Sequence, residues 1–413
     1  MDRFINKLYS VVLPFLPVLI LYGLPLSYMS KLTLADIILL LLAFFKVIVL
    51  INKLINKRVV KLDISAFCLM LYILTQPLLL SFYTDSVFID WGDAIGTSFR
   101  LAFYIAIYCI LFYDAVDKRS VIASFRVLGC ISVIYGTLQF IVANLFGISL
   151  SPYIPFLYVT RTGLEAQQSS WMKAGWLVRA RSFFSEPAAF SVFLLVALCI
   201  ELTLIYEHKQ KYKQNLLKLM YILGIMVSCS STGFVGLVFL YILYVLFVNK
   251  LSRRGIGIII LLTFLLIFAA VKIGYVDFVL NHTFAGGKGL QHQSHFSDIL
   301  IVFQNKINFW EMLFGHGMQD IMNGNIGLYI PGWHRTFHHL GVFGVMFYML
   351  FFFAVFRKLN KNRRLIIVLF IFLNIGTECM LGIYFILYMT VATMGHKKTR
   401  YFRLSKDSIV GRD

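Results

Sequence analysis

The sequence predicts an all-α, polytopic integral membrane protein, and three observations support this fold class. Of the 413 residues, 60% are apolar and only 14% are charged, and the mean hydropathy is +0.81. The 40 Phe and 22 Tyr residues, with long runs of Leu, Ile and Val, exceed what a water-soluble core of this size can bury. Apolar segments long enough to cross a bilayer recur along the chain. These features exclude a soluble, fibrous, disordered or nucleic-acid-binding protein.

About twelve apolar segments are expected to span the membrane and to form a single domain over residues 1–413. In chain order they cover residues 8–29, 33–51, 62–83, 94–113, 121–146, 187–206, 216–229, 231–248, 256–272, 337–356, 365–378 and 380–394. Two of the expected helices, 216–229 and 365–378, are shorter than the usual span of about 20 residues. We expect them as separate helices because the charge pattern requires an even number of crossings.

The placement of basic residues predicts the orientation of the chain. The net charge is +19, and 26 of the 38 Lys and Arg residues lie at the termini and on alternate connections, against eight on the opposite side. Because basic residues collect on cytoplasmic loops, both termini are expected in the cytoplasm. Four more, Lys46, Arg100, Arg126 and Lys272, fall inside helices, three of them near an end from which the side chain can reach the interface.

Two charged residues within apolar segments are candidates for function. Arg100 and Glu378 are both expected near the outer face, where a charge inside the membrane is costly enough to suggest a role. The alternative is that they form a structural pair.

Two long outer loops, 147–186 and 273–336, are the segments most expected to carry function, because connections are usually much shorter. The first loop ends with Arg179, Arg181 and Glu186, followed by Pro187. Proline suits the first turn of a helix and Glu186 suits its cap, so both arginines are expected above a helix N-terminus, where an anion is favoured. The alternative is a structural clamp between arginine and glutamate.

Two further polar elements lie at expected helix ends. The small residues of Ser228–Gly233 suit a tight helical hairpin, or alternatively a substrate crevice. In a helix that includes residues 334–339, His334 and His338 share one face, and Arg335 and His339 lie on the adjacent one. Histidines there could transfer protons or bind phosphate.

No metal or cofactor is expected. The histidines of Gln291–His295 have no cysteine or paired carboxylate at ligand spacing, and Gly286–Gly289 lacks the spacing of a phosphate loop. All six cysteines lie in apolar segments, so no disulfide framework is expected. Phe314–Gly317 is expected to form a glycine turn.

The expected topology favours an anionic ligand that enters from the lipid. The sixth, eighth and tenth helices begin on the outer side, so their positive ends face the region where the arginines and histidines gather. A lipid diphosphate fits this arrangement, because its tail can stay in the bilayer while its phosphates meet the arginines.

At these residues the chain resembles the Wzy-type polysaccharide polymerases of the bacterial O-antigen ligase and polymerase superfamily. The resemblance covers the layout of nearly all 413 residues, with many helices and two large periplasmic loops. Its local matches are Arg179 and Arg181 before Phe184–Pro187, the Ser-Ser-Thr-Gly segment, Phe314–Gly317, and Gly341 with Gly344.

The resemblance implies a metal-independent, inverting glycosyltransferase in the bacterial inner membrane with a periplasmic active site. Such an enzyme moves a growing glycan from undecaprenyl diphosphate to a sugar hydroxyl of the next lipid-linked repeat unit. The family's arginines map onto Arg179 and Arg181, and its polar cluster maps onto His334 and Arg335. Either Glu186 or His334 would be the base. His338, His339, Arg100 and Glu378 complete the expected substrate site, and a chain-length regulator and a flippase are the implied partners.

Two other functions compete with this hypothesis. A related O-antigen ligase would transfer the finished polymer to lipid A-core, but the family's His-Asn is here His334-Arg335. A polysaccharide-precursor flippase predicts internal repeats and charges along a central path, whereas the polar groups of this sequence gather at one face.

Overall fold

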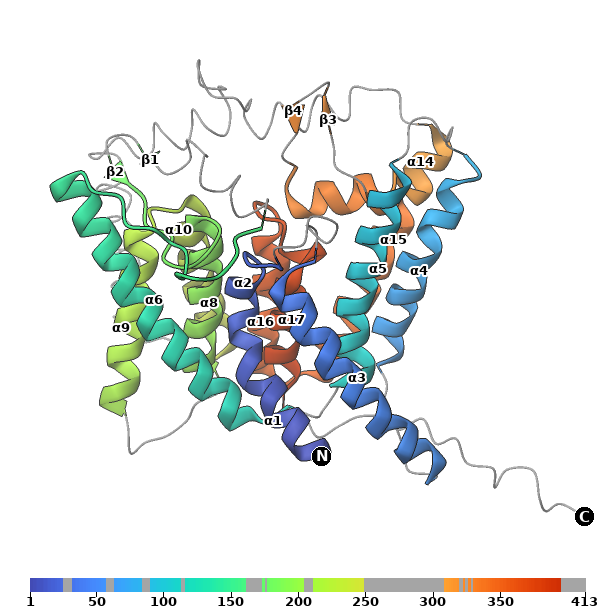
Figure 1. Cartoon of the computed structure of the whole chain (residues 1–413), viewed down its shortest axis with the longest axis horizontal. Helices are drawn as coiled ribbons and strands as arrows, with labels where there is room; N and C mark the ends of the chain where they lie inside the picture. Colours follow the sequence, from blue (N-terminus) through green and yellow to red (C-terminus); the bar gives the residue numbers. More distant parts are fainter. Residues whose placement is uncertain are drawn as a thin grey trace, which may run out of the picture.

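The computed structural model shows a bundle of helices with two very short β-ladders on the loops (Figure 1). It describes residues 1–24, 32–56, 63–83, 90–112, 116–160, 173–174, 177–203, 211–248, 308–318, 322–323, 326–327 and 330–394. Strand β1 (Lys173–Ala174) pairs with β2 (Leu177–Val178), and β3 (Met322–Asn323) pairs with β4 (Ile326–Gly327), both antiparallel.

The helices follow the apolar segments of the sequence. Their bounds are α1 Asp2–Val12, η1 Leu13–Phe15, α2 Leu16–Leu19, α3 Leu34–Ile55, α4 Ile64–Leu80, α5 Trp91–Ala106, the π-helix η4 Ile107–Leu111, α6 Lys118–Phe146, α8 Pro187–Thr203, α9 Lys211–Val227, α10 Ser231–Phe247, α14 Phe309–Phe314, α15 Gly332–Lys358, α16 Lys361–Leu373, η8 Cys379–Leu381 and α17 Ile383–Thr393. Helices occupy every expected span except 256–272, which lies outside the described residues.

Side chains of the expected types cap several helices. Asp63, Asp90 and Ser230 accept hydrogen bonds from backbone amides in the first turns of α4, α5 and α10. Thr33 and Asp36 form a capping box at the start of α3, and Gly147 ends α6 in the left-handed conformation.

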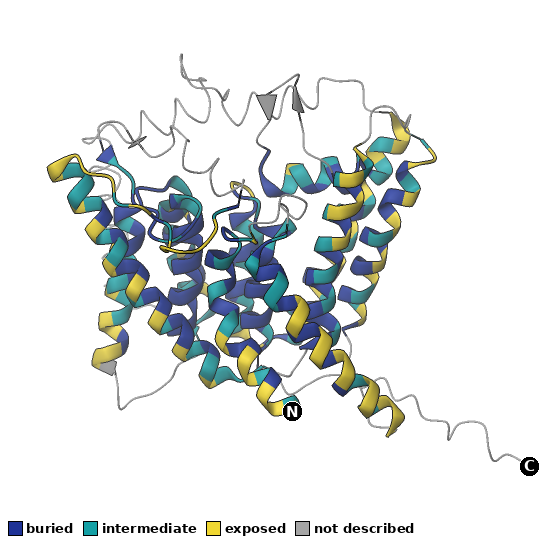
Figure 2. Ribbon diagram, viewed as in Figure 1, coloured by how far each residue is buried: buried dark blue, intermediate teal, exposed yellow. Residues whose placement is uncertain are grey.

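The chain is a mostly helical membrane protein. Among the described residues, four helices are long and apolar enough to cross a membrane: α3, α5 with η4, α6 and α15. Four shorter apolar helices accompany them: α4, α8 and α17 pack against the long helices, and α10 packs against α8, α9 and α16. Side chains such as Phe44 on α3 and Ile134 on α6 are exposed, whereas most of α8 and α17 is buried at the centre of the bundle (Figure 2).

Several helix boundaries differ from the prediction, among them that of α16, which spans Lys361–Leu373 and not 365–378. The first helix begins at Asp2 rather than at residue 8, and passes through a 3-10 turn at Pro14. Helix α9 is 17 residues long, not about 14. Helix α15 begins at Gly332, five residues before the expected start, and its backbone breaks at Gly341, where φ is 65°. The two parts of α15 therefore run in different directions (Figure 1).

Charged side chains inside the bundle are paired. Lys46 on α3 is buried and donates to Asp2 at 2.6 Å, and Arg126 on α6 binds Glu201 on α8 through two hydrogen bonds of 2.7 and 3.0 Å. Lys46 reaches Asp2, the first residue of α1, whose side chain is 30% exposed, so its charge is both paired and directed toward the end of α3.

Small residues bring α9 close to its neighbours. A Cβ atom on Gly224 would lie 2.5 Å from Leu194 on α8 and 2.7 Å from Val133 on α6. Close approach at small residues is typical of helix packing in membranes. The close packing of α6, α8 and α9 supports the residues that follow α6.

Candidate functional site

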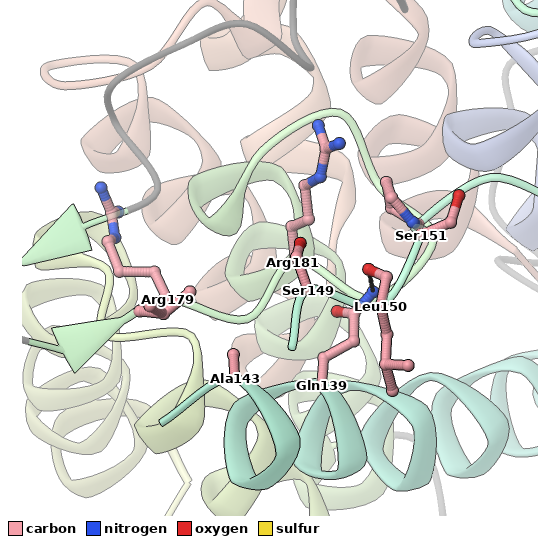
Figure 3. Close-up of a pocket in the computed structure, with 9 residues that line it drawn as sticks. Gln139, Ala143, Ser149, Leu150, Ser151, Arg179 and Arg181 are labelled. Atoms are coloured by element: carbon pink, nitrogen blue, oxygen red, sulfur yellow. Dashed lines mark hydrogen bonds between the residues drawn. The ribbon is translucent and has the colours of Figure 1, made fainter. Parts of the chain in front are cut away.

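A cavity lies between the end of α6, the residues that follow it and the segment before α8 (Figure 3). Its volume is about 300 Å³. The lining residues are Gln139, Ala143, Ser149, Leu150, Ser151, Pro152, Val178, Arg179 and Arg181. The structure therefore brings the two predicted arginines into one cavity, and Figure 3 shows both side chains pointing away from α6.

Fixed partners hold Arg181 in place. Its Nη1 donates to the Ser185 carbonyl at 2.8 Å, its guanidinium lies 5.3 Å from the centre of the Tyr153 ring, and the residue is only 4% exposed. The next residue, Ser182, has a positive φ of 53°, and its amide and carbonyl both bind the side-chain amide of Gln139 on α6. Gln139 thus fixes the turn that carries Arg181, a role that no sequence pattern indicates for a glutamine inside an apolar helix.

Glu186 directly precedes α8 and lies within electrostatic range of Arg179 and of Glu378, which follows α16. Burial raises the pKa of its carboxyl, the positive charge of Arg179 lowers it, and the negative charge of Glu378 raises it. The segment before α8 therefore lies near the turn that follows α16, so two parts of the predicted site that are distant in sequence are close in space. A carboxyl with a raised pKa is suited to general base chemistry near neutral pH.

Arg335 and Glu378 form an ion pair at the start of α15. The Arg335 Nε also donates to His339 Nε2 at 2.9 Å. His339 is 2% exposed, and its ring supports Arg335 from inside the bundle. That His339 binds substrate stays a prediction.

The other histidines of this region surround the same helix start. His338 stacks on His316 with ring centres 4.7 Å apart, and His316 lies 3.5 Å from the Glu311 carboxylate. His334 is exposed one turn before His338. Among the described residues, no group of three His, Cys, Asp or Glu side chains could hold a metal ion, and Gln291–His295 lies outside them.

The Phe314–Gly317 turn packs into the break of α15. The backbone of the turn and the backbone of α15 are too close for side chains at either glycine. A Cβ atom on Gly315 would lie 2.3 Å from the His339 backbone, and a Cβ atom on Gly341 would lie 2.3 Å from the Leu313 carbonyl. Gly315 and Gly341 both have positive φ. The predicted glycine turn is therefore present, and its function is to dock onto α15.

Donors on α4 satisfy carbonyl groups at the break. Tyr72 donates its hydroxyl to the Leu340 carbonyl at 2.6 Å, and the Gln76 amide donates to the His339 carbonyl at 3.3 Å. Tyr83, just after α4, donates to the Gly315 carbonyl at 2.6 Å. These contacts compensate for helical hydrogen bonds that the break removes.

The N-terminus of α15 is closed by protein carbonyls rather than open to an anion. The Gly332 amide donates to the Thr377 carbonyl at 2.8 Å, and the Trp333 amide donates to the Asn374 carbonyl at 3.1 Å. The expectation that this helix end attracts an anion is therefore wrong for α15, because the turn after α16 occupies its first donors.

Arg100 belongs to a different cluster from Glu378. Arg100 forms an ion pair with Asp36 and donates to the Tyr104 hydroxyl at 3.1 Å, and Tyr104 donates to Asp36 at 2.6 Å. The predicted alternative of an Arg100–Glu378 pair is wrong, because each residue has another partner of opposite charge. Asp36 was detectable in the sequence as an acidic residue three positions after a capping threonine.

The site therefore combines an arginine-lined cavity, a half-buried carboxyl at Glu186, and an Arg335–Glu378 pair at the same end of the bundle. Guanidinium groups can bind a phosphate or carboxylate through paired hydrogen bonds, and a nearby carboxyl can accept a proton. Comparison with known proteins found no protein family, curated protein or solved structure that matches this chain.

Proposed function

We propose that this protein is a Wzy-type polysaccharide polymerase, an inverting glycosyltransferase that joins oligosaccharide repeat units carried on undecaprenyl diphosphate. The observation that carries the proposal is the cavity of about 300 Å³ lined by Arg179 and Arg181, with Glu186 within electrostatic range of Arg179. The cavity offers two cations for a diphosphate, and Glu186 offers an acceptor for a proton.

The proposed reaction needs no redox step and no metal ion. The acceptor sugar hydroxyl attacks the anomeric carbon of the lipid-linked glycan, and the bond from that carbon to the diphosphate oxygen breaks. Arg179 and Arg181 stabilise the charge that develops on the departing lipid diphosphate. Glu186 takes the proton of the attacking hydroxyl, with His334 as the alternative base.

We place the cavity on the periplasmic side of the inner membrane. At the opposite end, Lys53 at the end of α3 binds Asp2 at the start of α1, and Lys358 at the end of α15 binds Asp63 at the start of α4. Helix α6 begins with Lys118 and Arg119 at that end and finishes beside the cavity (Figure 1). Basic helix ends of this kind favour the cytoplasmic side, and twelve crossings would place both termini there.

The test is polymer length in a host whose own copy of the gene is deleted. Arg179→Ala and Arg181→Ala should each abolish the ladder of repeat units and leave core with a single unit, because the leaving group loses its cation. Arg119→Ala, an exposed arginine at the opposite end of α6, is the matched control and should restore the full ladder.

Other outcomes would assign a different function. Loss of all repeat units with accumulation of a full-length lipid-linked polymer would indicate a ligase. Loss of lipid-linked units from the outer face would indicate a flippase. A full ladder in both arginine variants would refute the anion site.

A further inference from the structure

His339 and Gly317 bind each other through two reciprocal hydrogen bonds. The Gly317 amide donates to the His339 carbonyl at 3.1 Å, and the Nδ1 atom of the His339 ring lies 2.6 Å from the Gly317 carbonyl. The glycine turn is thus attached to both the backbone and the side chain of the same residue of α15.

The contacts of the ring define its protonation state. Arg335 can only donate, so the His339 Nε2 atom that faces Arg335 Nε at 2.9 Å must be an acceptor. The ring proton therefore lies on Nδ1, where it is donated to the Gly317 carbonyl. His339 is a neutral ring with a fixed orientation, one side bound to the turn and the other to the guanidinium.

Arg335 lies between two fixed partners. His339 accepts from its Nε, and Glu378 accepts from its Nη1. The Arg335 side chain is 24% exposed, whereas His339 is 2% exposed. Of the two, only Arg335 is placed to meet a ligand, and His339 controls the direction of its guanidinium.

We propose that His339 is a positioning residue, which transmits the position of the Phe314–Gly317 turn to Arg335 and so orients this cation toward the anionic lipid substrate. The inference rests on the proposed function for the identity of the substrate. The orientation of Arg335 by His339 can be tested without any assumption about activity.

Two substitutions separate the two bonds of the ring. His339→Gln retains an acceptor near the Nε2 position but loses the donor to Gly317, whereas His339→Asn retains a donor near Nδ1 but loses the acceptor for Arg335. If His339 acts through Arg335, His339→Asn should be the more damaging change. Asn is one methylene shorter than Gln, so a residue that only fills space also predicts a larger loss of stability in His339→Asn. It does not predict a change in the reactivity of Arg335 relative to Arg179, and this ratio is the discriminating readout.

The first measurement is chemical and uses the full-length protein in lipid nanodiscs. Phenylglyoxal modifies arginine side chains, and mass spectrometry of the digested protein reports the rate at each arginine. We expect Arg335 to react about tenfold faster in His339→Asn than in the unsubstituted protein, as the loss of one hydrogen bond to a charged group implies, and His339→Gln to lie within about threefold of it. Arg179 is the internal control. Its rate of modification should be the same in the unsubstituted protein and in both variants, which shows that the fold is retained.

The second measurement is the rate of chain extension on undecaprenyl-diphosphate-linked oligosaccharide. His339→Asn should be about tenfold slower than His339→Gln. Equal Arg335 modification in the two variants would overturn the positioning role. If the unsubstituted protein extends no chains while the difference in modification persists, the proposed function fails and the positioning role stands.

Discussion

At the residue scale, the surroundings of each charged group determine what it can do. Arg181 is buried against Tyr153 and lines the cavity, which places its positive charge at the cavity wall. Arg100 is held by Asp36 and Tyr104, which gives it a structural role in joining α3 to α5. The assignment of Arg179, Arg181 and Arg335 to substrate binding stays a prediction, which the proposed function uses.

The protonation of Glu186 should set the acid side of the pH profile. Glu186 accepts a proton only when ionised, so activity should rise with pH through the pKa of its carboxyl. Burial raises this pKa, Arg179 opposes the rise, and Glu378 adds to it. Glu378→Gln removes one negative charge, so the acid limb of the rate of chain extension should move to lower pH.

The control for this pH shift is Glu311→Gln, which changes a carboxyl on α14 near His316. It should leave the acid limb in place. A limb that moves to higher pH in Glu378→Gln, or moves equally in both variants, would contradict the role of Glu186.

Gly341 should tolerate no side chain. Gly341→Ala places a Cβ at a positive φ and 2.3 Å from the Leu313 carbonyl, so the turn must leave the break of α15. We expect a loss of about 1–3 kcal/mol in the free energy of unfolding, measured by thermal unfolding in detergent. The control is Gly96→Ala on α5, where the added Cβ meets nothing within 4 Å and the free energy of unfolding should rise by up to about 1 kcal/mol. Equal melting temperatures of the two variants would disprove the steric argument.

At the element scale, the sequence predicts helices well and their interruptions poorly. Hydropathy locates α3, α6 and α8 to within a few residues because the bilayer requires continuous apolar segments. The break at Gly341 depends on donors from α4 and on the glycine turn, which lie far away in sequence. A lone glycine in an apolar run does not reveal such partners, so the predicted tenth helix began five residues late and was continuous.

The Arg126–Glu201 pair links α6 to α8 and should be asymmetric in its cost. The Glu201 side chain is 1% exposed and that of Arg126 is 29% exposed. Arg126→Leu leaves a buried carboxylate without its cation and should cost about 3–5 kcal/mol in stability, whereas Glu201→Leu should cost less. The double variant Arg126→Leu/Glu201→Leu should recover most of the loss.

Unfolding of the four proteins in one detergent measures this cycle. If the two single losses simply add in the double variant, the pair contributes nothing through its mutual attraction.

At the scale of the whole molecule, functional groups gather at one end of the bundle. The sequence predicted this clustering because Arg179, Glu186, His334 and Arg335 all fall at the ends of apolar segments that point the same way. It did not predict the Arg335–Glu378 pair or the cavity wall formed by Gln139. These features depend on how helices pack side by side, which hydropathy along a single chain does not encode.

Labelling from outside the cell should report the orientation of the bundle. In a variant without its native cysteines, Ser149→Cys lies at the exposed end of α6 near the cavity, and Arg119→Cys lies at the exposed opposite end. A maleimide that cannot cross membranes should label the first in intact spheroplasts and the second only after lysis. The reverse pattern would place the cavity in the cytoplasm and exclude the proposed reaction.

The donors that close the break in α15 also imply an order of assembly. Tyr72 precedes its acceptor Leu340 by 268 residues. At ribosomal rates of about 5 to 20 residues per second, α4 is complete roughly 13 to 54 s before its partner is synthesised. During that interval the Tyr72 hydroxyl and the Gln76 amide need temporary hydrogen-bond partners, such as water, lipid headgroups or an assembly factor. The N-terminal helices of this protein therefore enter the membrane as an unfinished intermediate, whose polar groups would mark it for quality control until the last quarter of the chain arrives.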